Sequence, residues 1–130
     1  ELCSGGIIGM GETLEQRLAL AFELRELAIL SIPINILTPI AGTPLAALEP
    51  LSTDEIFRCI AMFRLINPRA VVRLAGGRGL LGRDQYSCFV SGANGAIVGD
   101  YLTTTGSRVT QDIAVLSALD FDLRRDIEGA

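Results

Sequence analysis

Residues 3–13 have the sequence CSGGIIGMGET, in which a short apolar run passes through a glycine-rich turn into the start of a helix. Thr13 followed by Gln16 forms a capping-box pattern, so a strand, a turn and a helix are expected here in succession. The glycines allow the backbone to approach a ligand closely. Their spacing does not match the dinucleotide fingerprint G-x-G-x-x-G. A ligand-binding loop and a turn needed only for packing both remain open.

The same alternation continues along the chain. Continuous apolar runs at residues 2–8, 32–37, 70–75 and 95–99 are typical of strands buried in a parallel sheet. Helices are expected after residue 13, from residue 52 to before Asn67-Pro68, over residues 83–91, and over about residues 110–119 with Ile113, Leu116 and Leu119 facing inward. The pattern predicts an α/β fold of parallel β/α units. Four units of roughly 31 residues make half of a (β/α)8 TIM barrel, and a four-stranded flavodoxin-like sheet is the alternative.

Composition excludes several kinds of function. The chain has 130 residues, no His, and only Arg among its eleven basic residues, so it contains no Ser-His triad and no Lys Schiff base. A net charge of −4 without a basic stripe argues against a nucleic-acid partner. The apolar stretch at residues 27–37 is shorter than the roughly 20 residues of a membrane span, so no membrane association is expected.

Three cysteines are present, none in a Cys-x-x-Cys pair. This odd number, without a signal peptide, favours a reducing, cytoplasmic location. Cys3 is expected near the carboxyl end of the first strand, where barrel enzymes place their chemistry. Because no His is available to activate a thiol nucleophile, ligation of a soft metal or cluster is the better functional interpretation, and an inert buried thiol is the alternative. Cys59 and Cys88 fall within helical patterns and are interpreted as packing residues.

Polar residues interrupt two of the predicted strands. Arg73 is flanked by apolar residues and is expected to point into a buried layer, where it needs an acid, a phosphate or a metal cluster as its partner. Arg78, in the following glycine-rich loop, is more easily placed at the surface. The Asn35 amide must find hydrogen bonds from the backbone or from a substrate. The hydroxyls at residues 101–105 either cap the last helix or reach a ligand.

Taken together, these segments resemble the biotin synthase family of radical S-adenosylmethionine enzymes. The resemblance covers the whole chain and implies the C-terminal half of a TIM barrel, its fifth to eighth units, with residues 1–130 forming the biotin and thiamin synthesis associated region. It is carried by residues 3–13, PIN at 33–35, GTPL at 42–45, VRL at 72–74 with Gly77-Arg78, and GANG at 92–95.

The resemblance also implies a reaction and roles for individual residues. The parent enzyme would insert sulfur into dethiobiotin to give biotin, using S-adenosylmethionine and two iron–sulfur clusters. Cys3 and Arg73 match ligands of the auxiliary cluster, which is a [2Fe–2S] or [4Fe–4S] cluster. Asn35 matches a residue that contacts dethiobiotin, and Ile7 and Thr38 match positions that line the adenine of S-adenosylmethionine.

The family's Cys-x3-Cys-x2-Cys motif is absent from this sequence. The [4Fe–4S] cluster that binds S-adenosylmethionine is therefore expected in a missing N-terminal half of the barrel, and the isolated chain is expected to be inactive. Because half a barrel exposes sheet edges and an apolar face, a homodimer is expected. The alternatives are a non-catalytic half-barrel for binding or assembly, and a related radical enzyme of thiazole or hydrogenase-cofactor synthesis.

Overall fold

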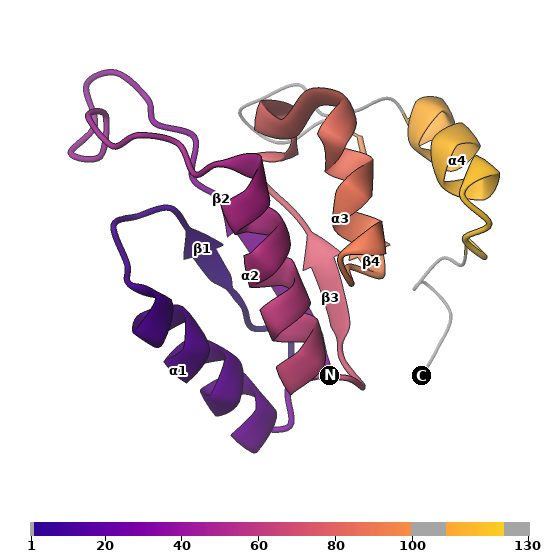
Figure 1. The fold of residues 1–130 in the computed structure, drawn as a ribbon, viewed down its shortest axis with the longest axis horizontal. Helices are drawn as coiled ribbons and strands as arrows, with labels where there is room; N and C mark the ends of the chain where they lie inside the picture. Colours follow the sequence, from indigo (N-terminus) through magenta and orange to yellow (C-terminus); the bar gives the residue numbers. More distant parts are fainter. Residues whose placement is uncertain (1, 100–108, 124–130) are drawn as a thin grey trace. The chain divides into compact units, whose positions relative to one another are not determined.

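The computed structural model describes residues 2–99 and 109–123, which alternate between strands and helices (Figure 1). By its internal contacts the chain divides into two compact units, Glu1–Ile97 and Val98–Ala130. The sheet and the helices that connect its strands belong to the first unit, and the helix α4 belongs to the second. The candidate site residues all lie in the first unit.

The sheet has four parallel strands in the order β1-β2-β3-β4. This order matches successive strands of a barrel, whereas a flavodoxin-like sheet places its first strand between the second and the third. The prediction of parallel β/α units in a half-barrel arrangement is therefore confirmed, and the flavodoxin-like alternative is wrong. The strands are β1 (Gly6–Ile8), β2 (Ser31–Ile36), β3 (Val71–Leu74) and β4 (Gly95–Ala96).

One face of this sheet is covered by helices. Right-handed crossovers between neighbouring strands place all the connecting helices on one side, and α1, α2 and α3 lie in front of the strands in Figure 1. A Cβ atom added to Gly6 would lie 2.7 Å from Leu20 of α1, which identifies the side that α1 covers. We call it the covered face, and six of its strand residues are each no more than 4% exposed: Ile8, Ile32, Ile34, Ile36, Val72 and Leu74.

The opposite side, which we call the open face, carries the alternate residues of the same strands. The pairing Ile7↔Asn35 and the pairing of Pro33 with Arg73 fix the register, and side chains alternate between the faces along each strand. Cys3 belongs to the same set, because it forms a bridge with the first residue of β2. Ile7 is 49% exposed, and the contrast with the covered face shows that the connecting helices leave this side uncovered.

The first two helices begin as the sequence predicts. α1 (Leu14–Glu26) has a complete capping box, in which the Thr13 side chain accepts from the Gln16 N–H and the Gln16 side chain accepts from the Thr13 N–H. α2 (Thr53–Ile66) begins where the Ser52 hydroxyl accepts from the Glu55 N–H. It ends at residue 66, as predicted from the Asn-Pro pair that follows.

The helix predicted over residues 83–91 is replaced by two consecutive helices over residues 78–90. The 3-10 helix η1 (Arg78–Tyr86) is interrupted by Gly82, whose φ of 52° and ψ of −124° are not helical. The α-helix α3 (Ser87–Val90) follows it directly. The sequence prediction missed the early start because the preceding residue, Gly77, has a φ of 84°, which turns the chain at the end of β3.

The GANG segment at residues 92–95 has a structural role. Arg64, near the end of α2, donates from Nε to the Gly92 carbonyl at 2.7 Å and from NH1 to the Ala70 carbonyl at 2.7 Å. The Asn94 side-chain oxygen accepts both from Arg64 and from the Val72 N–H. This arrangement ties the end of α2 to the starts of β3 and β4.

In the second unit, α4 (Val109–Ala118) buries Leu116, as predicted, but not Ile113 or Leu119. These two side chains are 48% and 45% exposed, so their predicted inward orientation is wrong. The buried positions are instead Asp112 and Leu116, which are four residues apart on one helix face. The hydroxyls at residues 101–105 lie outside the described residues.

Candidate functional site

Four predicted site residues lie on the open face, at successive levels along the strands. Cys3 is level with the first residue of β2 and Arg73 with the third, while Ile7 pairs with Asn35, the fifth. All four share one face because they are an even number of residues apart within this register. Cys3, Asn35 and Arg73, to which the resemblance assigns roles, therefore lie on one face of the sheet.

The predicted position of Cys3 near the carboxyl end of its strand is wrong. Cys3 lies at the amino end, because its bridge partner Ser31 is the first residue of β2 and β1 continues to Ile8. The thiol is exposed, and its sulfur accepts a hydrogen bond from the Ser31 hydroxyl at 3.4 Å. An exposed thiol on the open face fits the chemistry of a soft-metal ligand better than that of an inert core residue.

Arg73 is half-buried, and its side chain crosses toward β4. A Cβ atom added to Gly95 would lie 2.9 Å from the Arg73 Cγ, so glycine at this position leaves room for the arginine stem. The Cα atoms of Cys3 and Arg73 are about 12 Å apart, from a spacing of about 4.8 Å between strands and a rise of about 3.3 Å per residue. The two residues share a face of the sheet, while the Arg73 stem leans toward β4, away from Cys3.

The side-chain amide of Asn35 forms hydrogen bonds to the backbone of β1 and to the backbone just after β3. Its Oδ1 accepts from the Gly76 N–H at 2.9 Å, and its Nδ2 donates to the Gly6 carbonyl at 3.4 Å. The sequence left open whether the Asn35 amide binds the backbone or a substrate, and these two contacts show that it binds the backbone. The amide has a second Nδ2 hydrogen, so a role toward a ligand on the open face is compatible with this structural one.

Thr38 follows β2 and does not belong to the strand face. It is exposed and lines a shallow, mostly apolar pocket of about 450 Å³, formed within the loop after β2 by Leu37, Pro39, Ile40, Thr43, Pro44 and Leu45. Thr38 therefore lies beyond the carboxyl end of β2, at the same edge of the sheet as the loop that follows β1.

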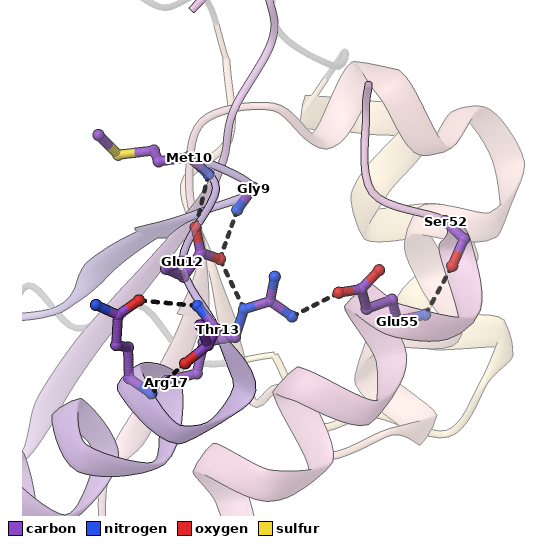
Figure 2. A network of polar contacts seen from close by, with 8 residues as sticks. Gly9, Met10, Glu12, Thr13, Arg17, Ser52 and Glu55 are labelled. Atoms are coloured by element: carbon purple, nitrogen blue, oxygen red, sulfur yellow. Dashed lines mark hydrogen bonds and ion pairs between the residues drawn. The ribbon is translucent and has the colours of Figure 1, made fainter. Parts of the chain in front are cut away.

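The glycine-rich loop after β1 is closed by a carboxylate from its own chain (Figure 2). Glu12 accepts from the Gly9 N–H at 2.8 Å and from the Met10 N–H at 2.7 Å. Positive φ angles at Gly9 and Gly11, of 93° and 94°, allow this tight turn. Because the two N–H groups are already bound to a carboxylate, they are not free donors for a phosphate.

The same carboxylate is linked to the helix layer. Arg17 donates from Nε to Glu12 at 2.6 Å and from NH1 to Glu55 of α2 at 2.8 Å, as Figure 2 shows. From the sequence, Glu55 is expected only as the partner of Ser52 in a second capping box, and no individual role is expected for Glu12 or Arg17. Glu12 next to the capping box was the only local indication, and 38 residues separate Arg17 from Glu55.

Hydrogen bonds and neighbouring charges favour the ionised forms of Glu12 and Arg17. Burial raises the pKa of Glu12, but hydrogen bonds from the Gly9, Met10 and Glu12 N–H groups and from Arg17 outweigh burial, and the net pKa lies below 4.5. Burial lowers the pKa of Arg17, and the two carboxylates more than compensate, so that its pKa is raised. Glu12 and Arg17 therefore carry their charges at neutral pH.

Arg78 and the two other thiols are buried. Arg78 is 3% exposed and donates to the Ile97 carbonyl at 3.0 Å, so its predicted surface position is wrong. It is buried because the turn at Gly77 directs the chain back against β4. Cys59 and Cys88 are buried, as predicted, and burial raises the pKa of each thiol to about 11.

Within residues 2–99 and 109–123, no three His, Cys, Asp or Glu side chains gather as a metal-ion site. The described part of the chain therefore offers an iron–sulfur cluster one accessible thiolate, from Cys3, with Arg73 on the same face. These two residues fit as part of a ligand set. No helix in the described ranges is both long and apolar enough to cross a bilayer.

The sequence of this chain is similar to one protein family and to several named proteins. The family model for the Biotin and Thiamin Synthesis associated domain matches residues 33–122. Biotin synthase of Desulfotalea psychrophila is 60% identical over 123 residues, which cover 95% of this chain and 37% of that protein. The biotin synthases of Brachyspira hyodysenteriae and Clostridium tetani are 54% and 52% identical over 122 residues, or 94% of the chain and 37% and 38% of those proteins. The chain thus spans less than two fifths of the length of these relatives.

Proposed function

The chain belongs to the Biotin and Thiamin Synthesis associated domain family, and we propose that it is the part of a biotin synthase that completes the sulfur-insertion site. The parent enzyme would convert dethiobiotin to biotin as a radical S-adenosylmethionine sulfurtransferase. The family description also covers thiamin synthesis. The names of the relatives, at 50–60% identity, support dethiobiotin over a thiazole precursor.

The main support for this proposal is the order of side chains along the open face. From the amino to the carboxyl end of the sheet, the sequence of levels is Cys3, then Arg73, then Ile7 with Asn35, with Thr38 beyond the strand end. In the roles implied by the resemblance, the cluster ligands come first, the substrate residue Asn35 shares the next level with the adenine position Ile7, and the second adenine position, Thr38, lies beyond the strand. A substrate held at Asn35 then lies between a sulfur source and a radical source.

Each residue has a task that its chemistry suits. The Cys3 thiolate binds iron, and the Arg73 guanidinium neutralises and ligates the same cluster from the neighbouring part of the face. The free Nδ2 hydrogen of Asn35 donates to the substrate, while Ile7 and Thr38 contact the adenine. When bound, the clusters and S-adenosylmethionine would supply the radical chemistry and the sulfur.

The remaining ligands come, in this proposal, from an N-terminal half of the barrel in the parent protein. That half would hold the [4Fe–4S] cluster for S-adenosylmethionine and the other thiolates of the auxiliary [2Fe–2S] or [4Fe–4S] cluster. The isolated chain would be inactive. A homodimer and a cytoplasmic location stay predictions.

The test is Cys3→Ala in the anaerobically reconstituted full-length parent protein. We expect the auxiliary iron and sulfide to be lost and biotin formation to fall below detection, while the cluster that binds S-adenosylmethionine is retained. Cys88→Ala, which changes a buried thiol away from the open face, is the matched control and should keep both clusters. A Cys3→Ala protein with full auxiliary iron and unchanged turnover would overturn the ligand assignment.

A further inference from the structure

The network around Glu12 connects the proposed adenosyl site to the helix layer. Glu12 holds the first two N–H groups after β1, and Ile7 lies only two residues before the first of them. The backbone at Ile8 is fixed on its other side, since its carbonyl accepts from the Leu37 N–H at 2.9 Å. The path of the loop beyond Ile8 is therefore determined largely by where the Glu12 carboxylate lies.

Arg17 determines that position. Its side chain is 8% exposed and contacts Glu12 and Glu55 with different nitrogens, so that one rigid guanidinium spans the gap between the loop and α2. These ion pairs are only partly buried, with the Glu55 side chain 47% exposed, and they are weak evidence for stability because desolvation of Arg17 offsets the attraction. The planar guanidinium does fix the relative positions of the two carboxylates, which an apolar contact would not do.

We propose that Glu12, Arg17 and Glu55 form a positioning relay that holds the β1–α1 loop and the exposed Ile7 in place to bind the adenosyl ligand. This inference rests on the proposed function. None of the three residues contacts the ligand in this proposal. They act through the backbone of Gly9 and Met10, whose N–H groups donate to the Glu12 carboxylate.

The experiment uses the full-length, cluster-loaded protein and measures three quantities for each variant. These are the dissociation constant for S-adenosylmethionine by anaerobic equilibrium dialysis, that for dethiobiotin at saturating S-adenosylmethionine, and the melting temperature. The variants are Glu12→Gln, Arg17→Lys and Glu55→Gln. Asp54→Asn is the matched control, because Asp54 precedes Glu55 on α2 and is 81% exposed in a 3.9 Å pair with Arg58.

We expect Glu12→Gln to weaken S-adenosylmethionine binding about tenfold and Glu55→Gln about two- to fivefold, with dethiobiotin binding changed less than twofold. Arg17→Lys should resemble Glu12→Gln, because an ammonium lacks the planar fork that reaches both carboxylates. In a relay, the double variant Glu12→Gln/Glu55→Gln should be no weaker than Glu12→Gln alone. Asp54→Asn should match the unmodified protein.

Three outcomes separate the alternatives. Unchanged S-adenosylmethionine binding in all three variants would overturn the relay while leaving the proposed function intact. Equal loss of both ligands in proportion to the melting temperature would also overturn it, because that pattern indicates a structural role alone. Failure of the unmodified protein to bind S-adenosylmethionine would overturn the proposed function itself.

Discussion

The two faces of one sheet differ in what their residues do. On the covered face, Ile34 and Val72 are almost completely buried beneath the helices and contribute to the core. On the open face, one residue along each strand, Asn35 and Arg73 are half-buried and polar. Alternation along a strand thus lets adjacent positions serve folding and chemistry separately. A substitution should affect mainly one of these two properties, according to the face on which it lies.

The largest effect is expected from truncation on the covered face. Ile34→Ala should lower the free energy of unfolding of the 130-residue chain by about 2–5 kcal/mol, because it leaves a cavity in the core. Ile7→Ala on the open face removes the same atoms from a half-exposed site and should cost about 1 kcal/mol or less. Urea unfolding measures both. Equal losses would contradict the division between the faces.

A smaller effect is expected at Asn35, which belongs to the open face but also binds the backbone. Asn35→Ala leaves the Gly76 N–H without its acceptor and should cost about 1–3 kcal/mol of stability. Asn35→Asp keeps that acceptor while losing the donors. It should therefore retain more stability but bind dethiobiotin at least tenfold more weakly in the full-length protein. Unimpaired dethiobiotin binding in both variants would remove Asn35 from the substrate site.

The smallest effect on stability is expected from a change of pH, through Glu12 and its contacts with the helix layer. Because the pKa of Glu12 is below 4.5 in the folded chain, the unfolded chain binds more protons between the two values, and stability falls as the pH drops through the folded pKa. This contribution is complete above about pH 4.5 and is lost below it. Urea unfolding from pH 3 to 7 should show a shallower acid dependence for Glu12→Gln than for the unmodified chain. An identical dependence would show that Glu12 has no part in acid stability.

Local patterns were sufficient to predict most of the fold. The capping box at Thr13, the Asn-Pro pair after α2 and the apolar runs of β2 and β3 are each decided by neighbouring residues. The helix after β3 was misplaced because Gly77 and Gly82 adopt backbone angles that the residue type permits but does not dictate.

The candidate site was predictable in its members but not in their positions. Cys3, Asn35 and Arg73 stand out as polar residues in or beside apolar strands. The level of Cys3 depends on the register between β1 and β2, which is a tertiary property. The link between Arg17 and Glu55 joins two helices across 38 residues, and no local pattern encodes it. Arg78 likewise becomes buried only because β4 lies beside its loop.

The sequential strand order has a consequence for how this chain folds. Each strand pairs with the strands before and after it in the sequence. Any two paired strands are therefore separated in the sequence by a single connecting segment. Contacts that are short in sequence separation lose less loop entropy before they form, and they favour rapid folding. During synthesis, each new β/α unit of this chain can therefore add to the edge of the unit made just before it, without waiting for a distant segment to emerge from the ribosome.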